Sequence, residues 1–315
     1  MRTNKNIIAI GRSRYLYDGI KHLVKQGYAF KAIITDEPYD EYDIKTQDFK
    51  DLASSIGACF LIVKTVPTEA IVNLVKSHNI HVAISANWKY TLSRDFISLF
   101  PGGVLNFHLG NLPDYKGNAT VNWSIINNEK YINANIHKMN PELDAGDVIS
   151  REAIPITSDT YVSDIISQAE RTAPLLFERA VSMMMEDPLA YEVKGSTQGL
   201  RCYPRLPEDS QIDWSQTPDQ ISRLVRASSH PYQGAYSFIN GEKVTIWKVK
   251  PVELSEQILA IPGHVVQLSR TDKSIIVACH EGLLKILEIG YKGEKLQPAE
   301  LIKSIRLRFK FLPHG

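Results

Sequence analysis

Cysteine is scarce in this sequence, and its distribution excludes two kinds of small, covalently held fold. The chain has three cysteines, Cys59, Cys202 and Cys279, and none of them forms a Cys-x-x-Cys pair. Disulfide frameworks and cysteine-based zinc sites both need closely spaced cysteines. We therefore expect an apolar core to hold the fold together and a reducing cytoplasm to be the working compartment.

Long apolar runs and an excess of one charge are also lacking. No apolar run reaches the ~18 residues of a membrane span, and no signal-peptide pattern precedes the first expected strand at Asn6. The 36 Lys and Arg nearly balance the 35 Asp and Glu, which leaves a net charge of +1. Proteins that bind nucleic acid over a wide surface are usually strongly basic. These absences favour a soluble, cytoplasmic, small-molecule enzyme, although they leave a local basic patch open.

The common nucleotide-binding motifs are absent. The first expected strand-to-helix turn, Gly11-Arg12-Ser13-Arg14, fits neither Gly-x-Gly-x-x-Gly nor a P-loop. Arg12 and Arg14 could still meet a phosphate at the helix N-terminus, and a solvated helix start is an equal alternative. We therefore take both arginines as candidate substrate-binding residues.

Histidine patterns indicate no metal site. The nine histidines include no His-Glu-x-x-His, and His78 and His81 straddle a helix end and a strand start. Four others, which have no convergent partners in the sequence, are His22, His137, His264 and His314. We predict that the protein uses no metal.

The first half of the chain alternates apolar runs with helix-like segments. Hydrophobic residues make up 43% of the 315 residues, enough for a core and for two domains. The expected strands are Asn6–Ile10, Lys31–Thr35, Phe60–Val63, Val82–Ser85 and Gly103–Phe107, and the helices between them are Arg14–Lys25, Gln47–Ile56 and Glu69–His78. This alternation is typical of a parallel sheet covered on both faces. Ligands bind such sheets at the carboxyl ends of the strands, here after Ser85 and after Phe107.

In the second half, the alternation of strands and helices gives way to short strands after a polar linker that ends near Pro204. Before the linker we expect two strands and a long helix: Tyr131–Lys138, Val148–Ile156 and Tyr161–Glu186. After it we expect a helix at 217–227, strands at 234–239, 243–250, 263–268, 274–278 and 283–289, and a basic helix at 299–311. Asn240-Gly241 is a strong hairpin signal. The sequence thus predicts an α/β fold: a Rossmann-like parallel-sheet domain over 1–200 and a small OB-like β-barrel over 201–315.

Chemistry-bearing residues gather in the segment 102–147. Asn106 and His108 alternate at the carboxyl end of a strand, so both point to one face. Asp144 follows thirty-six residues after His108, in an acidic turn just before a strand. An imidazole can take the proton of an attacking amine, a carboxylate can orient that imidazole, and an amide N–H can stabilise an oxyanion. The set suits acyl transfer to an amine. The alternative is a purely structural role, in which Asp144 caps a turn and His108 is a hydrogen-bonded core residue.

Three linked motifs in this segment resemble the signature of the 10-formyltetrahydrofolate-dependent formyltransferases. They are Asn106-Phe107-His108, the loop Leu112-Pro113-Asp114-Tyr115-Lys116-Gly117 and the turn Leu143-Asp144-Ala145-Gly146. Further matches at 204–214 and 225–235 extend the resemblance over nearly the whole chain. The resemblance implies a one-carbon transferase in which Asn106, His108 and Asp144 are the catalytic triplet.

The resemblance also implies a donor site for 10-formyltetrahydrofolate, used as a co-substrate. In this family the pterin lies against the loop after the fourth strand and against the backbone before the catalytic aspartate. The residues at these positions, which we expect to bind the co-substrate, are Asn87, Trp88, Lys89, Asn140 and Leu143.

The acceptor divides the family into branches. The methionyl-tRNA branch has this two-domain layout, but its early loop is typically basic, whereas the loop 36–43 here carries five carboxylates that would repel a phosphate backbone. The segments 112–129 and 87–90 look like the sugar-nucleotide branch, which forms N-formylated amino sugars for bacterial surface glycans of the O-antigen type. The resemblance therefore implies a dTDP- or UDP-linked amino-deoxy sugar. The candidate acceptor-binding residues are Arg12, Arg14, Lys116, Asn118, Arg205 and Tyr232.

Two other readings stay open at this point. One is a methionyl-tRNA formyltransferase, and the other is a catalytically silent folate- or nucleotide-binding module, against which the intact Asn-x-His and Asp set argues. The resemblance also makes a homodimer plausible, with the apolar C-terminal region as its interface.

Overall fold

The computed structural model describes residues 5–36, 43–66 and 68–311. Contacts along the chain divide it into two compact units. Unit 1 comprises Met1–Thr120, Tyr131–Pro155 and Ile166–Tyr203, and unit 2 comprises Val121–Lys130, Ile156–Ile165 and Pro204–Gly315. The acidic loop 36–43 lies outside the described residues except at its two ends, Asp36 and Asp43.

Unit 1 is built on a seven-stranded sheet with the order β3-β2-β1-β4-β5-β7-β8. Its strands are β1 (Asn6–Gly11), β2 (Ala29–Thr35), β3 (Cys59–Ile62), β4 (Val82–Ala86), β5 (Gly103–Leu109), β7 (Tyr131–Lys138) and β8 (Val148–Pro155). The first five are parallel, and β7 and β8 add an antiparallel edge. The predicted parallel sheet is therefore confirmed. The strand order reverses between β1 and β4, which is where ligands bind in such sheets.

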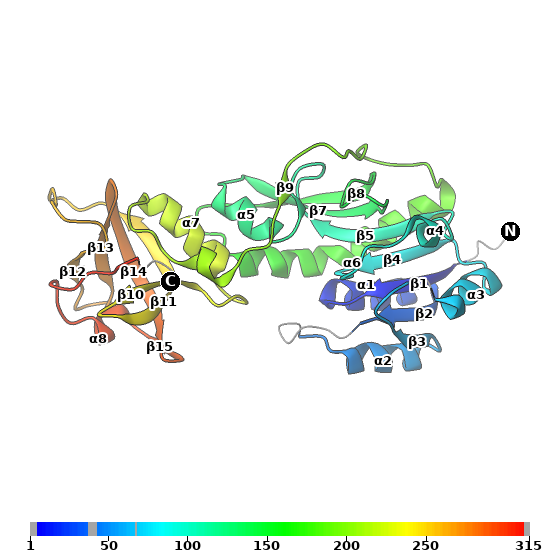
Figure 1. The fold of residues 1–315 in the computed structure, drawn as a ribbon, viewed down its shortest axis with the longest axis horizontal. Helices are drawn as coiled ribbons and strands as arrows, with labels where there is room; N and C mark the ends of the chain where they lie inside the picture. The colour runs from blue at the N-terminus through cyan, green and yellow to red at the C-terminus, as the bar shows by residue number, and fades with distance from the viewer. Residues whose placement is uncertain (1–4, 37–42, 67, 312–315) are drawn as a thin grey trace. The chain divides into compact units, whose positions relative to one another are not determined.

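Helices cover both faces of this sheet, as the apolar strands require (Figure 1). They are α1 (Arg14–Lys25), α2 (Thr46–Ser55), α3 (Glu69–Ser77), α4 (Arg94–Ile97) and α6 (Val162–Glu186). Apolar residues of α3 and α4 pack on the face that carries Ile8, Ile10 and Val104. The opposite face carries Phe107, whose ring contacts those of Tyr15 on α1 and Phe177 on α6. Alternation along β5 therefore turns Asn106 and His108 toward the α3 and α4 side.

Unit 2 is dominated by a six-stranded antiparallel sheet with the order β10-β11-β14-β13-β12, and β15 pairs with β14. The strands are β10 (Ala235–Ile239), β11 (Glu242–Val252), β12 (Val265–Leu268), β13 (Ile275–Cys279), β14 (Gly282–Tyr291) and β15 (Glu294–Leu296). Asn240 and Gly241, both with positive φ, join β10 to β11 as predicted. The other elements are α5 (Thr120–Ile126), η1 (Pro207–Ser210), α7 (Pro218–Ser228) and α8 (Pro298–Leu301). Trp214 lies in the core of this unit, where its indole donates to Ser237 Oγ at 2.9 Å.

The predicted basic helix at 299–311 is wrong. Only α8 forms there, and the chain beyond it runs extended, with bridges from Phe238 to Lys310 and from His264 to Arg308. The reason is a period-2 pattern, Arg-Leu-Arg-Phe-Lys-Phe over 306–311, which suits a strand better than a helix. Phe309 is 1% exposed and stacks on Trp214 at 5.2 Å between ring centroids. This segment links the two edge regions of the sheet and gives it a barrel-like closure.

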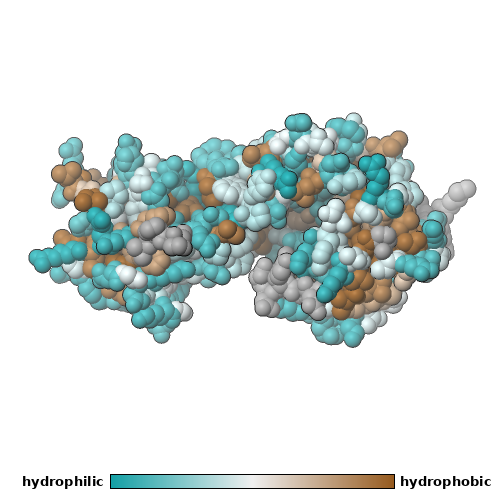
Figure 2. Space-filling view, in the orientation of Figure 1, coloured by the Kyte–Doolittle hydropathy of each residue, from teal (hydrophilic) through white to brown (hydrophobic). Residues whose placement is uncertain are grey.

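No helix among the described residues is long and apolar enough to cross a membrane. On the face shown in Figure 2, hydrophilic residues cover much of each unit, with smaller apolar patches between them.

Candidate active site

The register of β5 and β7 gathers four polar side chains on one face of the sheet. Asn106 lies opposite His137, and His108 lies opposite Asn135. Because directly opposed residues of an antiparallel pair share a face, all four side chains point the same way. The Asn106 amide nitrogen lies 3.1 Å from His137 Nε2. Two Asn-x-His triplets, 106–108 and 135–137, therefore face each other.

His108 is held in one tautomer by its partner. Its Nε2 donates to the Tyr115 carbonyl oxygen at 2.8 Å, and its ring is 9% exposed. A carbonyl oxygen only accepts, so the proton of the neutral ring is on Nε2. Nδ1 then carries the lone pair, and it lies 3.7 Å from Asp144 Oδ2. The ring nitrogen nearest the carboxylate is therefore the one that can receive a proton.

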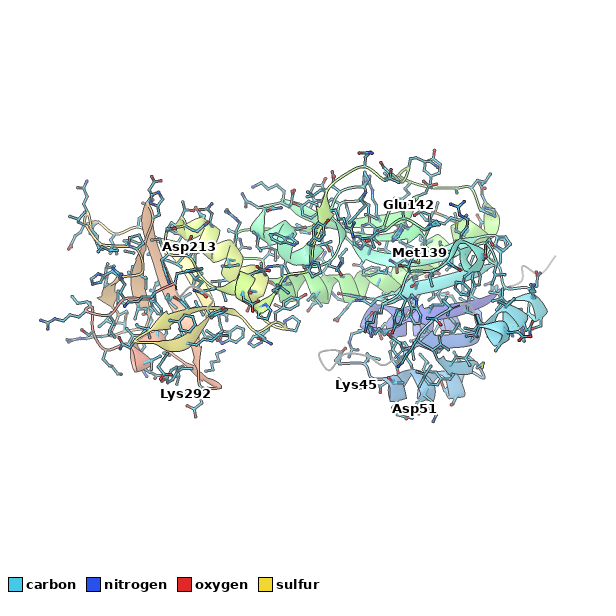
Figure 3. All side chains as sticks on the ribbon, in the orientation of Figure 1. Lys45, Asp51, Met139, Glu142, Asp213 and Lys292 are labelled. Carbon is cyan, nitrogen blue, oxygen red and sulfur yellow. The ribbon has the colours of Figure 1, made fainter. Side chains whose placement is uncertain are left out.

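Asp144 reaches this face from the turn between β7 and β8, which Met139 and Glu142 mark in Figure 3. The residue has a φ of 47°, and its Oδ2 accepts the Gly117 N–H at 2.9 Å. Burial alone would raise the pKa of its carboxyl, but the imidazoles of His108 and His137 and the Gly117 N–H outweigh it. The pKa is therefore held well below its ordinary value, and Asp144 carries a negative charge at neutral pH.

His137 also belongs to this site, although the sequence shows no partner for it. Its Nε2 lies 3.5 Å from Asp144 Oδ1, and the side chain is 2% exposed. Within the described part of the chain, its Nδ1 is buried without a hydrogen-bond partner. The available signal was the second Asn-x-His triplet at a predicted strand end. Only the antiparallel register shows that it meets the first.

Small residues make room for these contacts. A Cβ at Gly110 would lie 2.6 Å from His108 Nε2 and would overlap the Tyr115 carbonyl oxygen. A Cβ at Gly146 would overlap the Lys138 carbonyl. Asn135, 1% exposed, donates to the carbonyls of His108 and Gly110 and so fixes the strand end that carries the imidazole.

The residues expected to bind the co-substrate follow β4 or precede Asp144. Asn87 adopts a positive φ of 53° directly after the strand. The Trp88 ring packs on the core and meets Tyr90 edge-on at 5.6 Å, and the Lys89 ammonium lies 5.8 Å from the centre of the Tyr90 ring. In the described residues Trp88 Nε1 is buried and has no hydrogen-bond partner. A buried donor at the carboxyl edge of a sheet fits a polar heterocycle.

Asn140 and Leu143 lie on the turn that leads to Asp144. Asn140 Oδ1 accepts the Glu142 N–H at 3.1 Å, which shapes the turn, and Leu143 is 48% exposed. An exposed apolar side chain beside a charged site suits contact with a ligand. The assignment of these five residues to the co-substrate stays a prediction.

The candidate acceptor residues of unit 1 have different surroundings. Arg12 is 3% exposed and donates to Asp36 Oδ1 at 3.1 Å. Arg14 donates from Nε to Asp43 Oδ2 at 2.7 Å and borders a pocket of about 450 Å³. Asn118 is exposed on the loop after β6 (Lys116–Gly117). Their contact with an acceptor stays a prediction.

Lys116 is buried, with 5% exposure, and points away from the solvent. Its ammonium donates to the carbonyl oxygens of Ser196, Thr197 and Gln198 at 3.3, 2.7 and 2.9 Å. All three N–H groups of the ammonium thus donate to main-chain carbonyls. The sequence pattern does not indicate this structural role.

Arg205 and Tyr232 belong to unit 2. The Arg205 guanidinium donates to Ser228 Oγ, to the Asp209 carbonyl and to Ser210 Oγ, and its Cζ lies 6.0 Å from the centre of the Trp123 ring. Tyr232 is 46% exposed. The acceptor role of these two side chains also stays a prediction.

Metal-binding geometry is not found at this site: the described residues contain no group of three or more His, Cys, Asp or Glu side chains that could hold a metal ion. Asn106, His108, His137 and Asp144 can form hydrogen bonds at this site, and the two histidines and the aspartate can also transfer protons.

Comparisons with known proteins identify the family of this chain. The family model for formyl transferase matches residues 22–181, and the model for the formyl transferase C-terminal domain matches residues 206–306. A methionyl-tRNA formyltransferase of Ruminiclostridium cellulolyticum is 27% identical over 299 residues, which are 92% of this chain and 93% of that protein.

Solved structures share the fold at low identity. The sugar 3N-formyl transferase WlaRD, crystallised with dTDP and 5-N-formyl-THF, matches with a TM-score of 0.64 at 16% identity over 92% of this chain and 98% of that chain. The N-formyltransferase of Helicobacter canadensis, in complex with folinic acid and dTDP-3-aminofucose, has a TM-score of 0.64 at 15% identity, over 89% of this chain and 98% of that chain. HypX of Aquifex aeolicus in complex with tetrahydrofolic acid has a TM-score of 0.60 at 16% identity over 94% of this chain. This chain spans about half the length of HypX, 46% in that complex.

Proposed function

This chain belongs to the formyl transferase family and is a formyl-transferring enzyme, and from that premise we propose that it formylates the amine of a nucleotide-linked amino-deoxy sugar. The proposed donor is 10-formyltetrahydrofolate, and the proposed acceptor carries dTDP or UDP. The observation that carries the proposal is the site at the carboxyl end of β5, where Asp144 from the turn between β7 and β8 lies beside His108 and Asn106, a set of groups that suits acyl transfer to an amine.

His108 is the proposed proton acceptor. When bound, the co-substrate would supply a formyl group that an amine can attack; the bond from the formyl carbon to the folate nitrogen then breaks, and that nitrogen leaves as tetrahydrofolate with the proton that His108 had taken. The attacking amine loses its proton to His108 Nδ1, because Nε2 already carries one and donates it to the Tyr115 carbonyl. The imidazole becomes cationic, and Asp144 at 3.7 Å stabilises that charge. A positioned base of this kind contributes roughly 10²–10⁴-fold to a rate.

Asn106 is the proposed oxyanion donor. It lies one alternation before His108 on the same face, so its amide and the imidazole can meet the two sides of one carbonyl. Its contact with His137 Nε2 at 3.1 Å fixes the amide before any ligand arrives. A preorganised donor costs no reorientation during the reaction.

Two relatives support the small acceptor. WlaRD and the Helicobacter canadensis enzyme match this chain over 98% of their own lengths, and their structures contain dTDP or a dTDP-linked amino sugar. The acidic composition of the loop 36–43 also disfavours an RNA backbone. We further infer that the product enters an O-antigen type surface glycan and that the enzyme works in the cytoplasm, where folates and nucleotide sugars occur.

We also propose a catalytic domain over 1–200, a barrel domain over 201–315 and a homodimer. The two family models leave a gap between 181 and 206, which supports a boundary near residue 200. Exposed apolar side chains of unit 2, among them Leu259 and Ile261, support an interface there. Sedimentation of the full chain at micromolar concentration tests the dimer, and a purely monomeric profile would exclude it.

A methionyl-tRNA formyltransferase is the second candidate, because a relative of that name is 27% identical over 92% of the chain. One panel separates the two. The purified enzyme is given 10-formyltetrahydrofolate with dTDP-linked amino sugars, UDP-linked amino sugars or Met-tRNA. We expect turnover with a nucleotide sugar and none with Met-tRNA. The reverse result would assign the tRNA function. No turnover with any acceptor would favour a silent binding module.

A further inference from the structure

Three consecutive residues in the loop after β5, Tyr115, Lys116 and Gly117, include hydrogen-bond partners of both His108 and Asp144. The Tyr115 carbonyl accepts from His108 Nε2 at 2.8 Å, and the Gly117 N–H donates to Asp144 Oδ2 at 2.9 Å. Lys116 lies between them. The position of this tripeptide therefore decides the tautomer of the imidazole and the place of the carboxylate at the same time.

One residue of the tripeptide has an unfavourable backbone conformation. Tyr115 has a φ of 56°, whereas the φ of 95° at Gly117 is one that glycine adopts freely. A bulky residue in the left-handed region persists only where its surroundings hold it. The loop therefore needs an external support.

That support is the segment 194–203, which we call the strap. Lys116, 5% exposed, donates its ammonium to three successive strap carbonyls, those of Ser196, Thr197 and Gln198. An ammonium has three N–H donors and no acceptor, so all its hydrogen-bonding capacity is used here.

Main-chain bonds join the strap to the same loop. β6 pairs with β9 (Arg201–Cys202) in the strap. The Lys116 N–H donates to the Leu200 carbonyl at 3.1 Å, and the Leu200 N–H donates to Asp114 Oδ1 at 2.7 Å. The hydrogen bonds of the Lys116 side chain are thus part of a larger contact between the loop and the strap.

We propose that Lys116 is a positioning residue for formyl transfer. By holding the strap against the loop, it keeps the Tyr115 carbonyl on His108 Nε2 and leaves Nδ1 free as the base. In this role Lys116 does not contact the acceptor. The proposal rests on the catalytic roles proposed above for His108 and Asp144.

The variant Lys116→Met tests this directly, because it keeps an unbranched side chain only one atom shorter and removes the donors. We expect kcat to fall about 10–100-fold, as for a misplacement near 1 Å, with KM for the acceptor within about threefold. Nitrogen-15 NMR of histidine-labelled protein should show that His108 loses its single Nε2–H tautomer. The control is Lys194→Met, which removes an exposed strap lysine paired with Asp147 at 2.9 Å. It should keep the tautomer, with kcat within about twofold.

A second variant covers the case in which Lys116→Met does not fold. Gly199 has a φ of 114°, and a Cβ there would overlap the Pro113 carbonyl oxygen. Gly199→Ala should move the strap while leaving Lys116 in place, and it should produce the same tautomer change. An unchanged His108 spectrum in either folded variant would overturn the proposal. A raised acceptor KM at unchanged kcat in Lys116→Met would instead make Lys116 an acceptor contact. The NMR measurement needs no acceptor, so its result does not depend on which substrate the enzyme uses and can be told apart from a failure of the proposed function.

Discussion

At the scale of single residues, Asp144 shows how opposing effects settle the state of the site. Its side chain is 12% exposed, and burial of a carboxylate favours the neutral acid. His108, His137 and the Gly117 N–H all favour the charged form, and together they outweigh burial. The site therefore keeps a fixed negative charge beside an imidazole that changes its protonation during the reaction.

Asp144→Asn should lower kcat by about 10²–10⁴-fold, because a neutral amide cannot stabilise the cationic imidazole. The side chain keeps its shape, so the circular dichroism spectrum should be unchanged. Since the pKa of Asp144 is held below its ordinary value, the wild-type rate should not fall through its protonation anywhere above about pH 4. A variant with near wild-type kcat would remove Asp144 from the mechanism.

His137→Phe should lower kcat at least about tenfold, because it removes a contact that fixes Asn106 and a partner of Asp144. The matched control is His78→Gln, which alters an exposed histidine at the end of α3 and should keep full activity. Steady-state kinetics of both variants check the prediction. Equal rates in the two would reduce His137 to a core residue.

That Asn106, His108 and Asp144 lie close together could be predicted from sequence because their motifs are local, while their catalytic roles stay a prediction. Asn106 and His108 share one strand, and Asp144 lies in a recognisable turn. His137 and the target of Lys116 could not be predicted, because both depend on pairings between distant segments. The register of β5 with β7 decides the first, and the path of the strap decides the second.

At the scale of elements, the carboxyl end of β5 packs tightly against the loop 110–117, and no space remains for a side chain at Gly110. Gly110→Ala would push against His108 Nε2 and the Tyr115 carbonyl oxygen. We expect a loss of about 1–3 kcal/mol in stability from overpacking and at least about tenfold in kcat. Thermal melts and kinetics measure the two effects. Gly57→Ala is the control for kcat: nothing lies within 4 Å of a Cβ at that position, but its φ of 68° strains an alanine, so it should lose some stability and leave kcat unchanged.

The C-terminal segment that closes the barrel-like sheet depends on Phe309. Phe309→Ala should destabilise unit 2 by about 3–5 kcal/mol, because it empties a fully buried site stacked on Trp214. Phe311→Ala, at a side chain that is 51% exposed, should cost less than about 0.5 kcal/mol. Chemical denaturation followed by tryptophan fluorescence compares the two. Similar midpoints for both variants would contradict the role of Phe309.

Most of the strands and long helices were predictable from apolar periodicity, and the short elements were not. The strands of unit 1 and the Asn240-Gly241 hairpin follow directly from their patterns. The pairing of β6 with β9 involves two residues on each side, too few for any pattern. The segment 306–311 alternates basic and apolar residues, a period that favours a strand, so the helix predicted over 299–311 is wrong.

At the scale of the whole molecule, acid should destabilise the fold. Burial alone would raise the pKa of Asp144 and of Asp147. The two imidazoles and the Gly117 N–H lower the pKa of Asp144, and the Gly195 N–H and the Lys194 ammonium lower that of Asp147. The Ser215 hydroxyl lowers the pKa of Asp213. A carboxyl with a depressed pKa contributes stability above its unfolded value, and that stability is lost as the pH falls through the folded value. We expect Tm to be level from about pH 7 to 5 and to fall below about pH 4. A Tm that is higher at pH 4 than at pH 7 would contradict this.

The facing Asn-x-His triplets limit how such an enzyme can diverge. A one-residue insertion or deletion inside β5 or β7 would turn every following side chain to the opposite face and would separate Asn106 from His137. The connection between the two strands has no such period. The two strands can therefore accept substitutions but not insertions or deletions, whereas the connection between them can change in length beyond Gly117.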